Sequence, residues 1–425
     1  MGRIKKKIFK GDMGIWIIIL LLSIYSILAV YSASSQLAYR EAGGNTSFYL
    51  IRQAVMLMIG AATILLVHNI PYKYFSRASV YLWYLAIGLL VFTLFFGINV
   101  NDARRWIMLP GGITFQTSDF AKVALIMYIA RNLAIKEDEV NSWKGCFKKL
   151  YFPILLTVGL ILPANLSTAL LLFGTSMLLI LFSNLKLKYF AGMVAASLVL
   201  GFLFFGAVKT FKHVGRFETW NNRIENFTNK TDKTENIQEK HSKIAIAKGG
   251  LFGLGPGKSN QRNILPHPYS DYIFAIIIEE YGLVFGAIPL IVLYLYLFMR
   301  VKIIVKNTNR KFGAYIVSGL AALIILQAFS NMAVATNVIP VTGQPLPLVS
   351  YGGTSIVFMG MALGIILSVS REVEEMKNAK KAQEIEEDIS NAEIDDVSSN
   401  ETEPDEEVLK ESLNLVINTN ENEES

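Results

Sequence analysis

Apolar runs long enough to cross a lipid bilayer recur along almost the whole chain, and this feature constrains the fold more than any other. A bilayer core requires about 20 mostly apolar residues per helix. Only 17% of the 425 residues are charged, whereas soluble domains average roughly 25%. We therefore predict an all-α membrane protein with ten transmembrane helices and exclude a soluble enzyme. The predicted spans are 13–33, 49–70, 78–98, 118–134, 151–163, 167–183, 189–208, 272–300, 313–335 and 353–371.

Two features of these runs decide how they are divided. The first run follows a basic segment, as in a signal peptide, but it is too long for a signal-peptide apolar region and further spans follow it. We therefore predict an uncleaved first helix. Pro163 lacks the N–H needed to continue a helix, and Asn165 can cap the next one. Residues 151–183 are therefore predicted to form two short helices.

Lysine and arginine concentrate in alternate short loops, which predicts the orientation of the chain. The predicted inner loops each carry at least two basic residues, whereas the short outer loops carry only Arg40, Arg104 and Arg105. Both termini are therefore predicted to be cytoplasmic. The domains are a basic N-terminus over 1–12, a membrane domain over 13–371 and a tail over 372–425. From residue 376 the tail has 16 acidic and 4 basic residues, which predicts a disordered cytoplasmic extension.

A long polar loop, predicted over 209–271 between helices 7 and 8, carries a glycine-rich segment. Five glycines between Gly249 and Gly257 permit positive φ, and successive free N–H groups can form an anion-binding nest. Lys248 and Lys258 flank the segment. The alternative is a merely flexible turn. The segment lacks the context of a dinucleotide-binding or P-loop motif.

Carboxylates stand where this loop meets the next apolar run. Ser270 is a plausible N-cap, and Asp271 would lie in the first helical turn, where the helix dipole favours an anion. The structural alternative is that Asp271 only caps the helix. Glu279 and Glu280 follow within the apolar run, where a carboxylate is costly and indicates a functional site. One of this pair must therefore face protein or water.

Two other outer segments combine charge with irregular backbone. Asp119 and Lys122 are three residues apart at the start of a predicted helix, so an ion pair is plausible; Lys122 could equally bind a phosphate. Arg105 precedes this helix in the preceding loop. The loop over 340–355 contains three prolines and Ser350, and such backbone survives at membrane depth only when it is buried or lines a wet cavity.

Metal, disulfide and nucleic-acid functions receive little support from the sequence. The single cysteine, Cys146, excludes an intramolecular disulfide and a multi-cysteine metal site. His213, His241 and His267 are scattered through the long loop with spacings that match no metal site. No basic stripe with interleaved aromatic residues indicates nucleic-acid binding. No cofactor is evident, although a divalent cation (Mg or Mn) remains an alternative.

At these residues the sequence resembles the SEDS family of shape, elongation, division and sporulation proteins, whose branches are represented by FtsW and RodA. The resemblance covers roughly 13–371. Glu279-Glu280-Tyr281-Gly282 is more similar to the FtsW branch. The most specific motifs are Gly249-Gly250-Leu251-Phe252-Gly253 with Gly255-Pro256-Gly257, Leu265-Pro266 with Ser270-Asp271-Tyr272-Ile273-Phe274-Ala275, and the loop from Pro340 to Ser355.

The resemblance implies ten transmembrane helices in the bacterial cytoplasmic (inner) membrane and polymerisation of lipid II into peptidoglycan strands at the division septum. It implies as partners lipid II, a class B penicillin-binding protein transpeptidase, other division proteins and membrane lipids. Asp271 matches the family's essential aspartate, and Asp119 with Lys122 matches its buried acid–lysine pair. Two departures are Thr117-Ser118-Asp119, where the family has Pro-Ser-Glu, and Pro163-Ala164-Asn165, where many members have Gln-Pro-Asp.

The implied reaction converts an α-linked donor sugar into a β-linked product, so it inverts and needs one base. Asp271 is the predicted base. Two alternatives remain from the residues alone, a flippase for the same lipid-linked precursor and a scaffold for division proteins. The predicted pyrophosphate contacts are Arg105, Lys122, Arg223, Lys248 and Lys258, and the other predicted substrate-binding residues are Asp119, Glu280 and Ser350.

Overall fold

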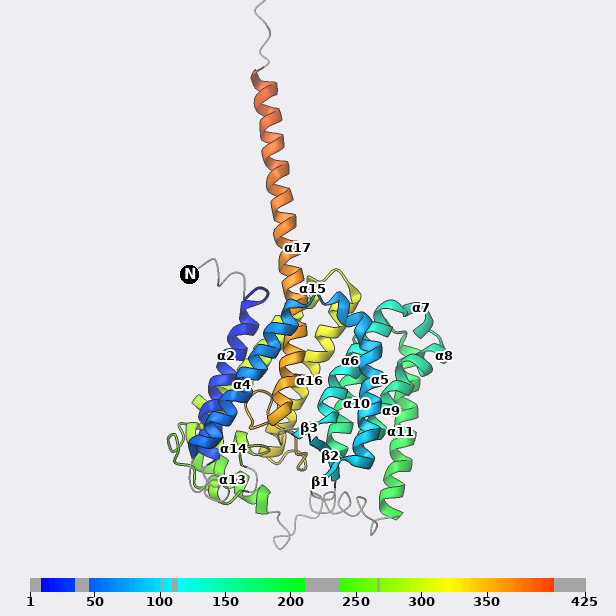
Figure 1. Cartoon of the computed structure of the whole chain (residues 1–425). Helices are drawn as coiled ribbons and strands as arrows, with labels where there is room; N and C mark the ends of the chain where they lie inside the picture. The colour runs from blue at the N-terminus through cyan, green and yellow to red at the C-terminus, as the bar shows by residue number, and fades with distance from the viewer. Residues whose placement is uncertain are drawn as a thin grey trace, which may run out of the picture. The chain divides into compact units, whose positions relative to one another are not determined.

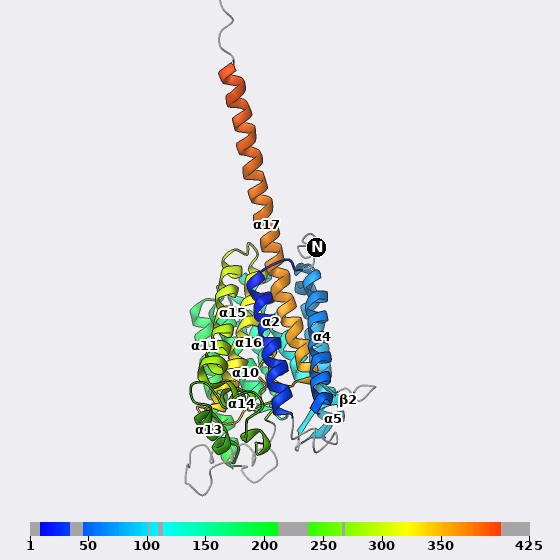
Figure 2. The same ribbon diagram turned by 90° about the vertical axis from the view of Figure 1, so that its left-hand side faces the viewer.

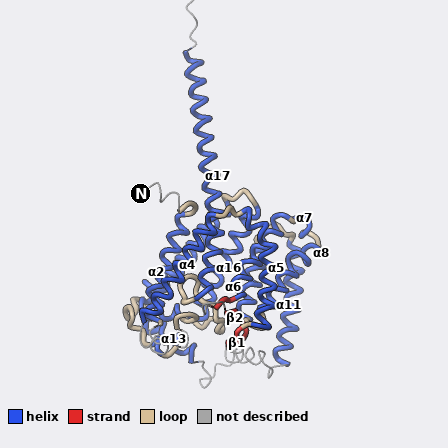
Figure 3. The backbone as a smooth tube through the Cα atoms, viewed as in Figure 1, coloured by secondary structure: helices blue, strands red, loops and turns tan. Residues whose placement is uncertain are grey.

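The computed structural model describes residues 9–34, 46–100, 103–108, 114–210, 237–265 and 268–400. Within the compact unit Met1–Val373, long helices run side by side in a bundle (Figure 1, Figure 3). Each predicted apolar run coincides with a helical segment. These segments are α2 (Met13–Ala33), α4 (Thr46–Asn69), α5 (Lys73–Phe96), α6 (Thr117–Ile135), η1 (Phe147–Tyr151) with α9 (Phe152–Ile161), α10 (Leu166–Leu181), α11 (Leu187–Thr210), α14 (Ile273–Gly282) with η3 (Leu283–Ala287) and α15 (Ile288–Lys306), α16 (Lys311–Ala335), and α17 (Gly353–Asn400).

The apolar helices confirm an all-α membrane protein and differ in how deeply they are buried. Seven are long and apolar enough to cross a bilayer, and α10 is a shorter apolar helix. In the most apolar window, 67% of α16 and 72% of α17 are buried, against 11% of α11. Helix α6 is buried along most of its length. Helices α6, α16 and the beginning of α17 therefore form the centre, while α11 exposes apolar side chains at the periphery.

The predicted break between the fifth and sixth apolar runs is confirmed. Helix α9 ends at Ile161, and α10 begins at Leu166. The side chain of Asn165 accepts a hydrogen bond from Thr168 N–H at 3.2 Å, as expected of an N-cap. A second break divides the long span Ile273–Lys306, where Gly282 has φ +72° and the π-helical segment η3 follows.

A small antiparallel sheet, which the sequence analysis did not predict, precedes α6. It joins β1 (Ile98–Val100), β2 (Ala103–Met108) and β3 (Thr114–Gln116) in that order. Trp106 pairs with both Ile98 and Gln116. Because β3 leads directly into α6, the sheet fixes where that helix begins.

The segment predicted as one long polar loop contains a helix of its own. Helix α13 (Ile237–Gly249) packs against α14, and its Ser242 hydroxyl donates to the carbonyl oxygen of Ala335 at 2.6 Å. Residues 211–236 lie outside the described part of the chain. Helix α11 also continues to Thr210, so the polar segment begins later than predicted.

The tail was predicted to be disordered, but its first part is helical, because α17 continues through the charged sequence to Asn400. The sequence after 371 is rich in alanine, glutamate, lysine and glutamine, which favour helix. The exposed pair Lys380–Glu384 has the i,i+4 spacing that supports a helix. The unit Glu374–Ser425 is separate from the bundle unit, and residues 401–425 lie outside the described residues.

The two ends of the bundle differ in structure. Helices α7 (Glu137–Val140) and α8 (Trp143–Cys146) lie at one end, and the sheet and α13 lie at the other (Figure 1). At the α7 end, Asp12 caps α2 and forms an ion pair with Arg300 at 2.6 Å. Helix α2 packs against α4 (Figure 2).

Candidate active site

Asp271 lies in a turn before α14 rather than in the helix. Helix α14 begins at Ile273, and its N-cap residue, Tyr272, makes no side-chain capping bond. The prediction that Ser270 caps the helix and Asp271 occupies its first turn is therefore wrong. The Ser270 hydroxyl instead donates to Asp271 Oδ1 at 3.1 Å. The carboxylate is half-buried, so a substrate hydroxyl can reach this position without complete desolvation of the acid.

The main chain at Asp271 is held at three consecutive carbonyl groups. The donors come from α16 and from the loop between α16 and α17, which we call the 336–352 loop. The position of the Asp271 carboxylate is therefore determined by hydrogen bonds to the backbone of this turn and not by a helical turn. The bonds are Tyr351 N–H to Tyr269 O (2.9 Å), Ser350 Oγ to Ser270 O (2.7 Å) and Asn331 Nδ2 to Asp271 O (3.0 Å).

The 336–352 loop is itself buried and anchored, which confirms the prediction for its irregular backbone. Its residues 344 and 346–350 are buried, and Leu348 has φ +61°. Side chains from two helices hold it. The bonds are Asn331 Nδ2 to Gln344 O (2.8 Å), Gln327 Nε2 to Pro345 O (2.9 Å) and Gln344 Nε2 to Thr168 Oγ1 (2.7 Å).

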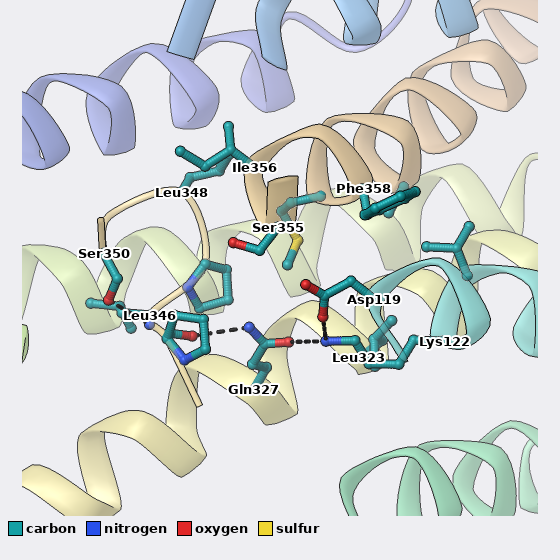
Figure 4. Close-up of a pocket in the computed structure, with 15 residues that line it drawn as sticks. Asp119, Lys122, Leu323, Gln327, Leu346, Leu348, Ser350, Ser355, Ile356 and Phe358 are labelled. Atoms are coloured by element: carbon teal, nitrogen blue, oxygen red, sulfur yellow. Dashed lines mark hydrogen bonds and ion pairs between the residues drawn. The ribbon is translucent and has the colours of Figure 1, made fainter. Parts of the chain in front are cut away.

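The predicted ion pair between Asp119 and Lys122 is confirmed inside the bundle. Lys122 Nζ lies 2.8 Å from Asp119 Oδ1, and both residues are buried. Lys122 also donates to Gln327 Oε1 at 3.1 Å (Figure 4). Asp119 Oδ2 is buried and has no hydrogen-bond partner among the described residues. The pair therefore retains acceptor capacity for a further donor.

A pocket that is partly open to solvent lies beside this ion pair. Figure 4 shows Asp119 and Lys122 on one side and the 336–352 loop on the other. Polar atoms from Gln327, Ser350 and Ser355 line it, and the remaining walls are mostly apolar. This combination suits a ligand that has a charged group attached to an apolar chain. Ser350 joins the pocket to the Asp271 segment, because it also binds Ser270 O.

Gln327, Asn331 and Gln344 are the residues of this network that the sequence analysis missed. Gln327 and Asn331 are four residues apart on α16, so they share one face of an otherwise apolar helix. That spacing was an available signal, because buried amides in an apolar helix need specific partners. Their partners lie in the loop and at Asp271, which the spacing could not reveal.

Arg105 is near the beginning of α6 but does not line the Lys122 pocket. Its Nε donates to Ala164 O at 2.7 Å. It lines a second, small pocket together with Ser118 and Asn165. Arg105 therefore lies on β2 with its side chain bound to the α9–α10 turn, and the structure does not bring it into the same pocket as Lys122.

The glycine-rich segment uses backbone N–H groups for contacts with α14, which leaves fewer of them for the predicted anion-binding nest. Its N–H groups at Leu254 and Gly255 donate to the carbonyl oxygens of Glu279 and Glu280, both at 2.9 Å. The glycines permit close contact between backbones: a Cβ on Gly253 would lie 2.2 Å from Glu280 O. The segment therefore packs against the end of α14 and has a structural role.

Lys248, Lys258 and Glu280 lie away from Asp271. Both lysines are exposed and belong to the segment that packs on the end of α14. Nine residues of turn and helix separate Asp271 from Glu280, which is on the order of 13 Å along a helix axis. Arg223 lies outside the described residues. Neither lysine nor Glu280 lines the pocket beside Lys122.

Glu279 and Glu280 are both buried in protein, where each accepts several hydrogen bonds. Ser32 and Ser259 bind Glu280, and Arg262 forms an ion pair with it at 3.9 Å. Glu279 accepts from the Ser259 hydroxyl and from backbone N–H groups at 260 and 261. The two carboxylates therefore hold the segment that follows the glycines in place by hydrogen bonds.

Among the residues that the structure describes, the remaining sequence candidates form no reactive or metal-binding centre. The described residues contain no group of three potential metal ligands. His241 contacts Gln261 at 2.7 Å, while His213 and His267 lie outside the described residues. Cys146 is buried, and burial raises the pKa of its thiol to about 11. It therefore remains protonated near neutral pH.

Comparisons with known sequences identify related proteins over most of the chain. A profile of the family described as cell cycle proteins, which groups FtsW, RodA and SpoVE, matches residues 12–375. A probable peptidoglycan glycosyltransferase FtsW from Trichlorobacter lovleyi is 31% identical over 84% of this chain and 93% of its own. Stage V sporulation protein E from Bacillus subtilis is 31% identical over 85% of this chain and 97% of its own.

Solved structures share the same fold. A chain described under structural coordination of polymerization and crosslinking by a peptidoglycan synthase complex has a TM-score of 0.68 at 22% identity. It covers 85% of this chain and 98% of its own. The rod shape determining protein RodA of Thermus thermophilus has a TM-score of 0.60 at 24% identity, over 85% of this chain and 97% of its own. At these identities the likeness shows the fold alone.

Proposed function

Because the chain belongs to the family of cell cycle proteins that comprises FtsW, RodA and SpoVE, we infer that it is a peptidoglycan glycosyltransferase. Relatives that carry this name are 31% identical over more than four fifths of the chain. We propose further that it joins lipid II units by inverting transfer and releases undecaprenyl pyrophosphate.

Asp271 is the proposed general base. In the reaction the acceptor hydroxyl oxygen forms a bond to the anomeric carbon of the donor, and the bond from that carbon to pyrophosphate breaks. The hydroxyl proton passes to the Asp271 carboxylate, so one carboxylate is sufficient for a single displacement. The observation that carries this role is the half-buried carboxylate on a turn whose three successive carbonyls are fixed.

Lys122 and Asp119 are the proposed contacts for the charged part of the substrate. A lysine ammonium can bind pyrophosphate oxygens as a point charge. The apolar walls of its pocket suit a lipid chain, and Ser350 connects that pocket with the Asp271 turn. Asp119 would then keep the Lys122 side chain oriented between substrates. Within the described part of the chain, no ligand cluster assigns a divalent cation to this site.

We propose that ten helices span the membrane with both termini in the cytoplasm. The ten helical segments and the basic inner loops support this topology. It places Asp271 on the outer side, because α14, which Asp271 precedes, lies at the opposite end of the bundle from α7 (Figure 1). A role at the division septum is supported by the motif Glu279-Glu280-Tyr281-Gly282.

A class B penicillin-binding protein is the proposed partner. One solved chain of the same fold comes from a synthase complex that coordinates polymerization and crosslinking. A transpeptidase would use the nascent glycan strand as its substrate, so an outward-facing polymerase site suits such a partner. Other division proteins are proposed as partners on the same grounds as the septal role.

The proposed activity is tested by giving labelled lipid II to the purified full-length protein, alone and with a class B partner, and separating the products on a gel. Polymer formation is expected, and its loss in Asp271→Asn assigns it to this chain rather than to a contaminant. Translocation of lipid II across vesicles without polymer would favour a flippase. Neither activity, with partner binding retained, would favour a scaffold.

A further inference from the structure

Asn331 joins three parts of the structure through one amide group. It lies on α16 and is 1% exposed. Its Nδ2 donates to Asp271 O at 3.0 Å and to Gln344 O at 2.8 Å, so both amide hydrogens are used. The opposite amide orientation would direct its oxygen at two carbonyl oxygens and is therefore excluded. Asn331 thus links α16, the Asp271 turn and the 336–352 loop.

This amide is satisfied on one side only. Asn331 Oδ1 is buried and has no hydrogen-bond partner among the described residues. A buried acceptor without a donor is unfavourable for stability. The benefit of asparagine at this position must therefore come from its two donated bonds. One of these bonds ends on the residue that carries the proposed base.

The hydrogen bond from Asn331 Nδ2 to Asp271 O lies just before α14, at a backbone position that precedes the hydrogen bonds of the helix. The first hydrogen bonds into α14 accept on Tyr272 O, from the N–H groups of Ala275 and Ile276. Asp271 is one residue earlier, so its peptide orientation depends on contacts from outside the helix. Two bonds separate its Cα from its carboxylate carbon, and a small rotation of the peptide would therefore displace the carboxylate.

We propose that Asn331 is a positioning residue, which orients the Asp271 carboxylate for proton transfer by fixing the Asp271 carbonyl relative to the 336–352 loop. This proposal rests on the function of Asp271 as general base. Asn331 itself touches no substrate. A displacement of about 1 Å at a reacting group can cost on the order of 100-fold in rate, so a lost positioning bond should affect turnover more than substrate affinity.

Thr168 provides a matched control within the same network. Its hydroxyl accepts a bond from Gln344 Nε2 at 2.7 Å and is buried. Thr168→Val keeps the branched shape and removes this anchor of the loop. Because it leaves the bond from Asn331 to Asp271 intact, it loosens the same loop residue without releasing the Asp271 carbonyl.

The test compares Asn331→Ala, Asn331→Ser, Thr168→Val and Asp271→Asn as full-length proteins with lipid II as substrate. For Asn331→Ala, kcat is expected to fall about 10- to 100-fold while KM and Tm stay close to those of Thr168→Val. Asn331→Ser retains one donor and should fall between Asn331→Ala and the unaltered chain. Thr168→Val should retain kcat.

Equal kcat values for Asn331→Ala and Thr168→Val would overturn the positioning role, as would a change confined to KM. If Asn331→Ala does not insert, Asn331→Ser carries the same comparison, and a kcat equal to that of Thr168→Val overturns the role. Polymerisation by Asp271→Asn would instead refute the base assignment. An active Asn331→Ala beside an inactive Asp271→Asn refutes only the positioning role.

Discussion

Lys122 is a charged side chain inside an apolar bundle, and two contacts stabilise it there. Its ammonium group forms an ion pair with Asp119 at 2.8 Å and donates to Gln327 at 3.1 Å. Breaking a buried pair on one side leaves an uncompensated charge and costs about 3–5 kcal/mol. Lys122→Ala should therefore lower the Tm in detergent, and adding Asp119→Ala should recover much of the loss.

The same variants distinguish a structural ion pair from a substrate contact when lipid II polymerisation is measured beside Tm. If Lys122 binds pyrophosphate, the double variant regains stability and remains inactive, which is the expected result. A double variant that recovers both stability and polymerisation would reduce Lys122 to a structural residue.

The site was predictable from sequence where its contacts are local. Asp119 and Lys122 are three residues apart, so helical geometry alone predicted their ion pair. The bond from Asn331 to Asp271 joins residues 60 positions apart, and nothing in the spacing specifies it. The contact of the glycine-rich segment with α14 was missed, because the bonds from Leu254 and Gly255 N–H to Glu279 and Glu280 O join residues 25 positions apart.

At the level of elements, the close packing of the glycine-rich segment on α14 gives a direct stability test. Gly253 has φ +79°, and an added Cβ would lie 2.2 Å from Glu280 O. Gly257 has φ +73° but open space around its Cβ position. Gly257→Ala should therefore cost only the strain of a left-handed residue, about 1–2 kcal/mol, whereas Gly253→Ala should cost more.

Thermal unfolding of the two glycine variants in detergent measures this difference. Equal Tm values for Gly253→Ala and Gly257→Ala would show that the contact with α14 is not tight. Both variants keep the flanking lysines, so a loss of polymerisation in Gly257→Ala alone would restore the anion-binding interpretation.

The helices were predictable because each apolar run must bury its backbone in lipid as a helix. The break at Pro163 followed from the missing proline N–H. The β1–β3 sheet and α13 were not predicted, since their short or polar sequences are stabilised by packing against α5, α6 and α14. The end of α17 was also missed, because charge ends a membrane span without ending a helix.

At the scale of the whole molecule, the acidic tail should be dispensable for the chemistry. The bundle unit ends at Val373, and Glu374–Ser425 is a separate unit. Among the described residues, none from 376 onward lines the Lys122 pocket. After deletion of 376–425, polymerisation of lipid II by the purified truncated protein should therefore match that of the full chain. Loss of activity in a stably inserted truncation would show that the tail supports the catalytic unit.

The proposed function depends most on Asp271. The most direct test is the rate at which a protein with a substituted Asp271 polymerises lipid II. Asp138 on α7 is an exposed acid at the other end of the bundle, so Asp138→Asn is a control for lost charge. General-base catalysis contributes about 10²–10⁴-fold. Asp271→Asn should therefore polymerise at least about 100-fold more slowly than Asp138→Asn, with an unchanged Tm. Equal rates for the two variants would contradict the account.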